Sequence, residues 1–395
     1  MVSTMPGKIT LSLNQIPLLA SLQKTWQALE SNADLSFFQS WSWIGVWLES
    51  LPARIAPLLL RVERDGVIIG LSILSSRSIL RHGILRSSAL FLNSTGDPVL
   101  DEITIEHNGF LAERGSEEVV AQACVEFLLG KQSDWEEIFL DGLRLPEVIE
   151  AMDFGRGRLR ATSRRTCHVV NLEPLRQAGS DYLSLLGKNT RYTIRRSLRA
   201  YEKRGAVELV EAVSVQQARD FLHRLRYLHQ RYWQKKGMPG SFANQFFSDF
   251  HDRLVEKGFP EGAIQMLRLT VGGHEIGYLY NFIYRGRVYN YQSGFDYDQA
   301  GAHDRPGLVC HALSVGHNTK QGHRVYDFMA GDSDYKKNLG TASETMAWCV
   351  IQQPYLKFRV EDILRATRRW LWRRASMLTR EQRADSIRSQ HERSS

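Results

Sequence analysis

The chain of 395 residues is 43% hydrophobic and 24% charged, an ordinary composition for a soluble globular protein long enough for two domains. It has no apolar run near the ~18 residues of a membrane span and no signal-peptide pattern at its N-terminus. Residues 356–395 hold eleven Lys/Arg and five Asp/Glu, so +6 of the total net charge of +8 belongs to this tail. The weakly charged remainder argues against a DNA-binding protein.

The N-terminal half predicts, in chain order, two strands joined by a hairpin turn, a polar stretch, a helix and a third strand. Alternating apolar residues mark the strands, and an apolar stripe at helical spacing marks the helix. The strands lie at 57–62, 67–74 and 135–140 and the helix at 117–129, and the polar stretch between the second strand and the helix contains Gly96-Asp97-Pro98.

The second half begins with two long helices and then repeats the same plan. Three strands with short Gly-rich turns form an antiparallel meander, after which a helix leads to a fourth strand. Because a helix crossing between neighbouring strands implies a parallel pair, the sheet is expected to be mixed. These elements lie at 181–204, 215–236, 265–271, 276–284, 288–293, 307–321 and 325–329.

The repeated plan predicts an α/β (α+β) protein of two tandem lobes, each a mixed, mainly antiparallel sheet flanked by helices. The Gly- and Arg-rich stretch near 155–165 is the expected boundary. We therefore predict a degenerate N-terminal lobe at 1–160, a second lobe at 161–355 and a basic tail at 356–395. The first lobe is expected to shape an acceptor groove without doing chemistry.

Several segments together resemble the CelD-type, FemAB-like branch of the GNAT acyltransferase superfamily, associated with cellulose and other polysaccharide biosynthesis. Their order and spacing span about residues 35 to 355, and both lobes resemble the GNAT core. The matching segments are Phe38-Gln39-Ser40-Trp41-Ser42-Trp43, the basic helix from Lys188 to Gly205, Leu228 to Gly237 with Gly240-Ser241-Phe242, and Asp327 to Lys336.

The resemblance implies a donor site at the start of the 307–321 helix, with Arg305, Gly307 and Leu308 as cofactor-binding residues. A helix start presents unpaired N–H groups and partial positive charge, which suit a phosphate. Gly307 allows a ligand to approach the backbone closely. The guanidinium of Arg305 adds positive charge and can donate two parallel hydrogen bonds to a phosphate. The alternative is that Pro306-Gly307 only begins a helix. Of the superfamily's fuller Gln/Arg-x-x-Gly-x-Gly/Ala signature, Gly307 and the helix are recognisable.

Three residues near the last predicted strand are the candidate catalytic groups, because acyl transfer needs proton removal, oxyanion stabilisation and protonation of the leaving thiolate. Asp327 is a candidate base or orienter, Tyr335 a candidate acid, and Lys336 a candidate partner of the oxyanion or a phosphate. The alternatives are a turn cap for Asp327 and a buried anchor for Tyr335.

Two helices supply the candidate substrate-binding residues Arg191, Arg195, Arg196, Arg231 and Trp233. The first helix carries a basic stripe almost free of acids, which indicates an anionic partner. The second places Arg beside aromatic residues, a combination that can line a sugar or acyl groove. The alternatives are a solvated charged face and ordinary aromatic packing.

The four scattered cysteines and the isolated histidines lack metal-ligand spacing, so no metal or disulfide framework is predicted and a cytoplasmic setting is the simplest. The segment 364–374 is basic with tryptophans at its centre, which is typical of a contact with an anionic membrane surface. The alternative is a cationic tail, and residues after about Thr379 are predicted to be disordered.

The favoured function is therefore an enzyme that transfers an acyl group from acetyl-CoA or another acyl-CoA. The resemblance implies an amine or hydroxyl acceptor on a polysaccharide or cell-envelope precursor. Two alternatives stay open: a Fem-like transferase that uses aminoacyl-tRNA, and a non-catalytic accessory protein of envelope polysaccharide synthesis.

Overall fold

One continuous mixed sheet runs through the whole computed structural model, which describes residues 7–130, 134–154 and 157–367. Its strand order is β1-β2-β3-β4-β6-β13-β7-β12-β11-β10-β9-β8, with β5 beside β3. The strands are β1 (Ile9–Gln15), β2 (Leu58–Arg64), β3 (Val67–Arg81), β4 (Leu85–Leu92), β5 (Leu111–Ala112), β6 (Glu137–Leu143), β7 (Arg158–Asn171), β8 (Val207–Glu211), β9 (Ile264–Val271), β10 (His274–Tyr284), β11 (Arg287–Phe295), β12 (Val325–Ala330) and β13 (Ala342–Gln352).

The predicted tandem plan is confirmed, because each half of the sheet is an antiparallel meander closed by a helix and a parallel strand. In the first half, α3 leads from β4 to the parallel strand β6; in the second, α9 leads from β11 to the parallel strand β12. The longer helices are α1 (Leu19–Ser31), α2 (Trp41–Ser50), α3 (Glu117–Leu128), α6 (Lys188–Glu202), α7 (Val215–Lys235), α8 (Gln245–Gly258) and α9 (Pro306–Lys320), and the shorter ones are α4 (Pro146–Glu150), α5 (Leu172–Gln177) and α10 (Asp334–Leu339).

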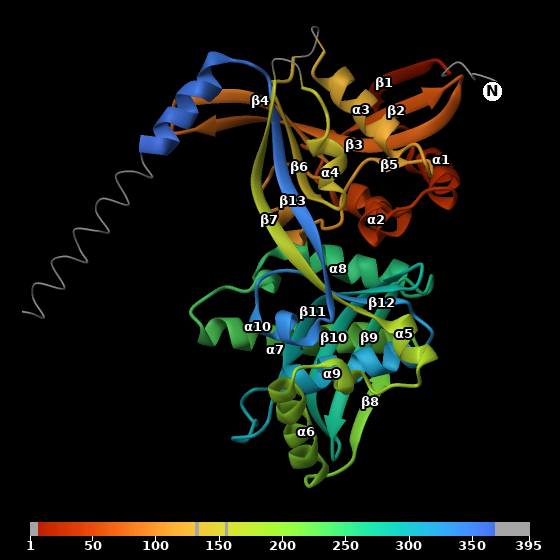
Figure 1. The fold of residues 1–395 in the computed structure, drawn as a ribbon, viewed down its shortest axis with the longest axis vertical. Coiled ribbons are helices and arrows are strands. Elements are labelled where there is room, and N and C mark those ends of the chain that lie inside the picture. Colours follow the sequence, from red (N-terminus) through yellow and green to blue (C-terminus); the bar gives the residue numbers. More distant parts are fainter. Residues whose placement is uncertain (1–6, 131–133, 155–156, 368–395) are drawn as a thin grey trace, which may run out of the picture.

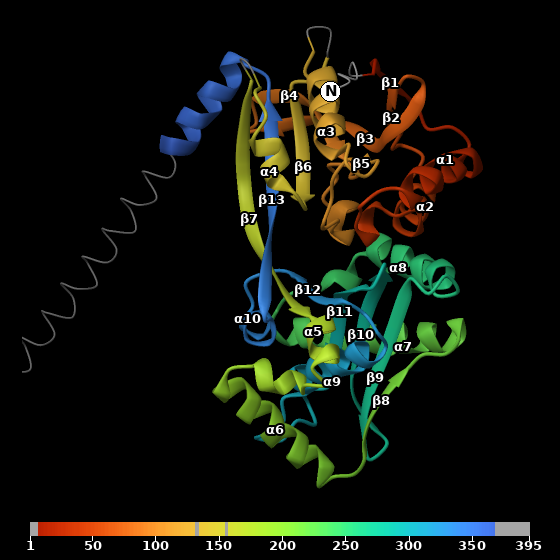
Figure 2. The same cartoon turned by 45° about the vertical axis from the view of Figure 1, so that its right-hand side comes forward.

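Two long strands, β7 and β13, join the halves (Figures 1 and 2). They pair with each other along the length of β13, and β13 also pairs with β6 while β7 pairs with β12. The predicted polar stretch of the first lobe was wrong in part, since β3 extends to Arg81 and pairs there with β4, a strand that the sequence pattern missed. Serines and arginines fill this hairpin, so its strand character comes from pairing.

The tail lies beside the first lobe, where residues 356–367 form a helix (Figure 1). The predicted basic segment from 368 to 374 and the predicted disorder after Thr379 lie outside the described residues. None of the described helices is both long and apolar enough to cross a membrane. All four cysteines are buried thiols.

The largest hydrophobic core crosses from one lobe to the other. Phe37 and Trp43 of the first lobe pack on Phe282 of β10, with a Phe37–Phe282 ring separation of 4.4 Å. Phe250 of α8 packs edge-on against Trp43. Aromatic pairs of this kind add to the free energy gained by burying the rings. The lobes therefore share one core and are expected to unfold together.

We predict that Phe282→Ala lowers the free energy of unfolding by about 3–5 kcal/mol, because it leaves a cavity in the shared core. Urea unfolding followed by tryptophan fluorescence and by circular dichroism should show one transition in both proteins. Phe127→Ala, which removes an aromatic ring that is 42% exposed on α3, is the control with little expected effect. Two separate transitions, only one of them shifted, would contradict a shared core.

Candidate functional site

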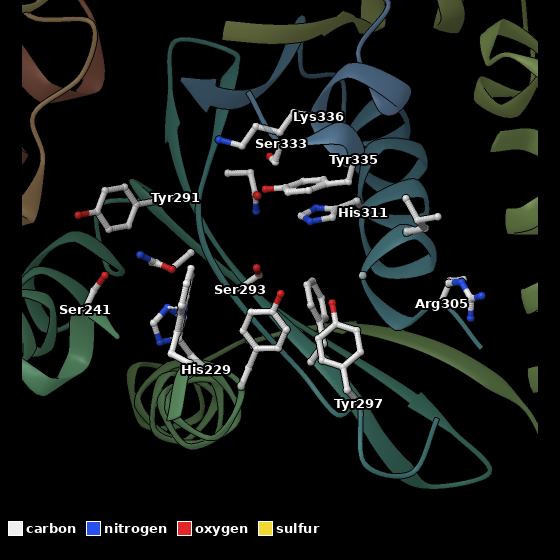
Figure 3. A pocket seen from close by; sticks show the side chains of 18 of the residues that line it. His229, Ser241, Tyr291, Ser293, Tyr297, Arg305, His311, Ser333, Tyr335 and Lys336 are labelled. Atoms are coloured by element: carbon white, nitrogen blue, oxygen red, sulfur yellow. Dashed lines mark hydrogen bonds between the residues drawn. The ribbon is translucent and has the colours of Figure 1, made fainter. Parts of the chain in front are cut away.

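A cavity of about 630 Å³ lies where β11 and β12 part. The two strands pair only from Arg287↔Val325 to Tyr289↔Asp327, although β11 continues to Phe295. Residues 290–295 of β11 then form one wall of the cavity, and α7, the start of α9 and α10 form the others (Figure 3). This volume is typical of a small-molecule site.

The three predicted cofactor-binding residues line this cavity at the start of α9. A Cβ added to Gly307 would lie 3.2 Å from Phe295 Cε2 and 3.3 Å from Tyr297 Oη, so the absent side chain keeps the space open. The Arg305 N–H donates to Ser197 Oγ on α6 at 2.9 Å, which fixes the helix start against the basic helix. The start of α9 therefore lies beside a cavity of suitable size for a ligand, and helix starts suit phosphates.

Tyr335 and His311 form a stacked pair on the side of the cavity opposite His229 (Figure 3). Their ring centroids are 5.1 Å apart with an interplanar angle of 9°. Burial raises the pKa of Tyr335 to about 12, so its phenol stays protonated at neutral pH. Burial, helped by the charge of Lys336, lowers the pKa of His311 to about 3, so its imidazole stays neutral.

His311 is a site residue that the sequence analysis missed. Its side chain is 1% exposed, and its Nδ1 has no hydrogen-bond partner in the described part of the chain. The available signal was its position four residues after Gly307, which puts both on one face of α9. A neutral imidazole here can hydrogen-bond a ligand but is a poor base at neutral pH.

Lys336 lies over the end of β12 and also lines the cavity. Its ammonium donates to the carbonyl of Ala330 at 2.7 Å and to that of Met329 at 3.2 Å, which leaves one N–H for a ligand. Burial lowers its pKa, and the negative charge of Glu106 opposes this shift. Glu106 comes from the first lobe, is buried, and accepts from the Ala330 N–H at 2.8 Å.

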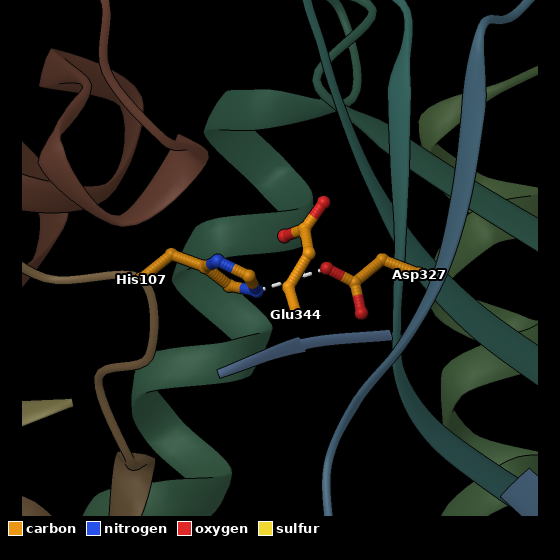
Figure 4. A group of neighbouring side chains, drawn as sticks. All are labelled: His107, Asp327 and Glu344. Carbon is orange, nitrogen blue, oxygen red and sulfur yellow. Dashed lines mark ion pairs between the residues drawn. The ribbon is translucent and has the colours of Figure 1, made fainter. Parts of the chain in front are cut away.

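Asp327 is placed differently from Tyr335 and Lys336, because its fully buried carboxylate is already bound by Arg287 and lies against His107. Figure 4 shows the contact with His107. The Oδ2 of Asp327 lies 2.7 Å from Arg287 Nη2 and 2.9 Å from His107 Nε2, and its Oδ1 accepts from the Met329 N–H at 2.7 Å. Burial would raise the pKa of this carboxyl, but His107 and Arg287 outweigh it and hold the pKa well below its usual range. Such a carboxylate orients its neighbours and is a poor proton acceptor.

His107, Asp327 and Glu344 bring their ligand atoms within 4.8 Å of one another, a spacing that could hold a metal ion (Figure 4). Arg287, however, already donates to both carboxylates, with Nη2–Oε2 of Glu344 at 2.6 Å. The guanidinium supplies the positive charge that a metal would bring, so these residues do not fit an ion.

The predicted substrate-binding residues are divided between the cavity and the surface. Trp233 lines the cavity, and its Nε1–H donates to His229 Nε2 at 2.9 Å. Arg231, two positions earlier on α7, lies outside the lining and pairs with Asp298. The three predicted α6 residues, Arg191, Arg195 and Arg196, also lie outside the lining, on the helix that flanks the start of α9. Their roles in binding stay predictions.

We predict that Asp327→Asn lowers the free energy of unfolding at pH 7 by roughly 3 kcal/mol, because it leaves the largely buried guanidinium of Arg287 without this carboxylate. The depressed pKa contributes stability above the unfolded-state value near 3.9, and that stability is lost as the pH falls below it. The difference between wild type and variant in urea unfolding should therefore shrink below about pH 4.

Asp34→Asn is the matched control for this change. It removes another carboxylate paired with an arginine, Arg144, but this pair lies on the surface and is expected to contribute under about 1 kcal/mol. A pH-independent loss in Asp327→Asn, or an equal loss in Asp34→Asn, would contradict the stabilising role of the buried charge cluster.

Comparison with known proteins agrees with this fold. Residues 188–337 match the family model of an acetyltransferase (GNAT) domain. The structure of FemX superposes with a TM-score of 0.56 at 10% identity over 88% of this chain and 99% of FemX.

Two further solved structures are less similar. The C-terminal domain (DUF2156) of a putative lysylphosphatidylglycerol synthetase from Agrobacterium fabrum gives a TM-score of 0.49 at 11% identity over 88% of this chain and 96% of that one. A tandem GNAT protein from the clavulanic acid biosynthesis pathway gives 0.43 at 9% identity over 87% and 98%. No curated protein matches the sequence. Residues 188–337 thus resemble a GNAT acetyltransferase domain, and the chain as a whole shares the fold of FemX.

Proposed function

We propose that this protein is an acyltransferase that moves an acyl group from an acyl-CoA, such as acetyl-CoA, to an amine or hydroxyl of a polysaccharide or cell-envelope precursor. The observation that carries the proposal is the parting of β11 and β12 beside the start of α9. This arrangement combines a helix start, which suits a phosphate, with the unpaired end of β11, which lines the cavity.

The open edges suit the extended pantetheine arm of CoA, which contains amide groups. Beyond Tyr289 and Asp327, the described parts of β11 and β12 are not paired with each other. An extended amide chain can add to such an edge through main-chain hydrogen bonds. The pyrophosphate would then lie at Arg305 and Gly307, with the basic face of α6 alongside.

Two residues at the far side of the cavity suit the chemistry of transfer. The acceptor nitrogen or oxygen attacks the thioester carbonyl carbon, the new C–N or C–O bond forms and the C–S bond breaks. Tyr335, protonated at neutral pH, gives its proton to the leaving thiolate and regains one from the acceptor through solvent. The remaining N–H of Lys336 stabilises the oxyanion that develops on the carbonyl.

The α7 wall suits a sugar-containing acceptor. Tyr232, Trp233 and Tyr297 line the cavity, and the Tyr232 and Tyr297 rings lie 5.2 Å apart. Aromatic faces offer apolar surface to the C–H faces of sugar rings, while the indole N–H of Trp233 is already bound to His229. Acceptor recognition is expected to rest on shape and stacking here.

We predict that Arg305→Ala weakens acyl-CoA binding by about 1–3 kcal/mol, because it removes a charge-assisted contact with phosphate. Gly307→Val should weaken it too, since a side chain there meets Phe295 and Tyr297 at the cavity wall. Isothermal titration with acetyl-CoA and longer acyl-CoAs measures both effects.

The matched control is Arg231→Ala, which removes an arginine outside the cavity lining. Unchanged acyl-CoA affinity in both Arg305→Ala and Gly307→Val would refute the donor site. Tight binding of charged tRNA with none of acyl-CoA would favour the Fem-like alternative.

A second prediction separates chemistry from packing at Tyr335. Tyr335→Phe keeps the ring stacked on His311 but removes the phenolic hydroxyl and its proton. Turnover should therefore fall about 10²–10⁴-fold, while the affinity for the donor is retained. The measurement is turnover at saturating donor together with thermal melting. Full turnover in Tyr335→Phe would leave Tyr335 as a structural anchor, whereas no measurable turnover in the wild type would favour the accessory-protein alternative.

A further inference from the structure

The helix formed by residues 356–367 is fixed to the first lobe by one face. Phe358 and Glu361 are buried on that face. Glu361 Oε1 lies 3.4 Å from Arg81 Nε of β3, and Lys357 Nζ donates to the carbonyl of Arg86 at 2.8 Å. The helix is therefore part of the folded body and has a defined outer face.

That outer face is apolar, whereas the outward face of an ordinary surface helix is polar. Leu356 is 73% exposed, Val360 40%, Ile363 66% and Leu364 39%. Their spacing of i, i+4, i+7 and i+8 puts all four on one stripe. Contiguous exposed apolar surface of this kind marks a binding face.

We infer that this outer face docks on an anionic lipid surface. The sequence that continues from this stripe is positively charged: residues 365–374 contain five arginines, two tryptophans and no acidic residue. An apolar stripe next to arginine and tryptophan is the composition that binds the interface of a membrane with acidic headgroups. A second copy of this chain would bring the same positive charge and be repelled.

Membrane docking would keep the protein near lipid-linked precursors, but it does not depend on the proposed acyl transfer. The stripe and the cavity share no residue, so the two proposals fail independently. The first lobe and the helix fixed to it thus gain a role as the membrane-facing part of the molecule.

The test is cosedimentation of the full chain with phosphatidylcholine vesicles that contain or lack phosphatidylglycerol, at low and high salt. Wild type should bind the anionic vesicles and lose affinity in high salt. Val360→Glu/Ile363→Glu should bind at least about tenfold more weakly, because two charges enter the apolar stripe. Val67→Glu changes a similarly exposed residue, 64% exposed at the start of β3, and should bind like wild type.

Melting temperatures establish that the variants are folded, and Ile363→Ser serves as a milder change that should also weaken binding. The proposal is overturned if wild type ignores anionic vesicles, or if folded Val360→Glu/Ile363→Glu binds as tightly as wild type. It is also overturned if light scattering shows a wild-type dimer that the double variant converts to monomers, because a second copy would then cover the stripe.

Discussion

The buried carboxylate of Asp327 is the point on which the geometry of the cavity depends. Its Oδ1 holds the N–H of Met329, a non-glycine residue at φ +64°, and so fixes a bulge in β12 opposite β7. A bulge inserts one extra residue and bends its strand. β12 therefore leaves β11 directly after Asp327, and the cavity occupies the space between them. The strain at Met329 persists because Arg287 and His107 hold the carboxylate in place.

The first lobe contributes to this arrangement through one loop. His107 contacts Asp327, and the neighbouring Glu106 accepts the Ala330 N–H, so two consecutive residues hold both sides of the bulge. His107 itself has φ +49°, and its N–H lies 2.9 Å from Met346 Sδ of β13. The Tyr291 hydroxyl from β11 donates to the Ile103 carbonyl of the same loop at 2.5 Å. The first lobe thus positions Lys336 and the end of β12.

Local signals allowed the meander, the crossover helix and much of the cavity wall to be predicted. Gly-rich turns marked β9, β10 and β11, and Pro306-Gly307 marked the start of α9. Tyr335 and Lys336 follow the last strand of that plan, which put them near the helix start. By contrast, β13 begins with four exposed residues and shows no alternation there, so its strand character comes from pairing with β6 and β7.

The partners of Asp327 could not be predicted for the same physical reason. His107 lies 220 positions earlier in the chain, and a single sequence carries no sign that two distant charges meet in a buried place. Asp327 was therefore as compatible with a base as with an orienter until its surroundings were known. A base needs free access to a proton, whereas this carboxylate is enclosed by Arg287, His107 and a backbone N–H. Since Glu106 and His107 come from the first lobe, a second lobe on its own would leave both Asp327 and Lys336 short of charge partners, and the site requires both halves of the chain.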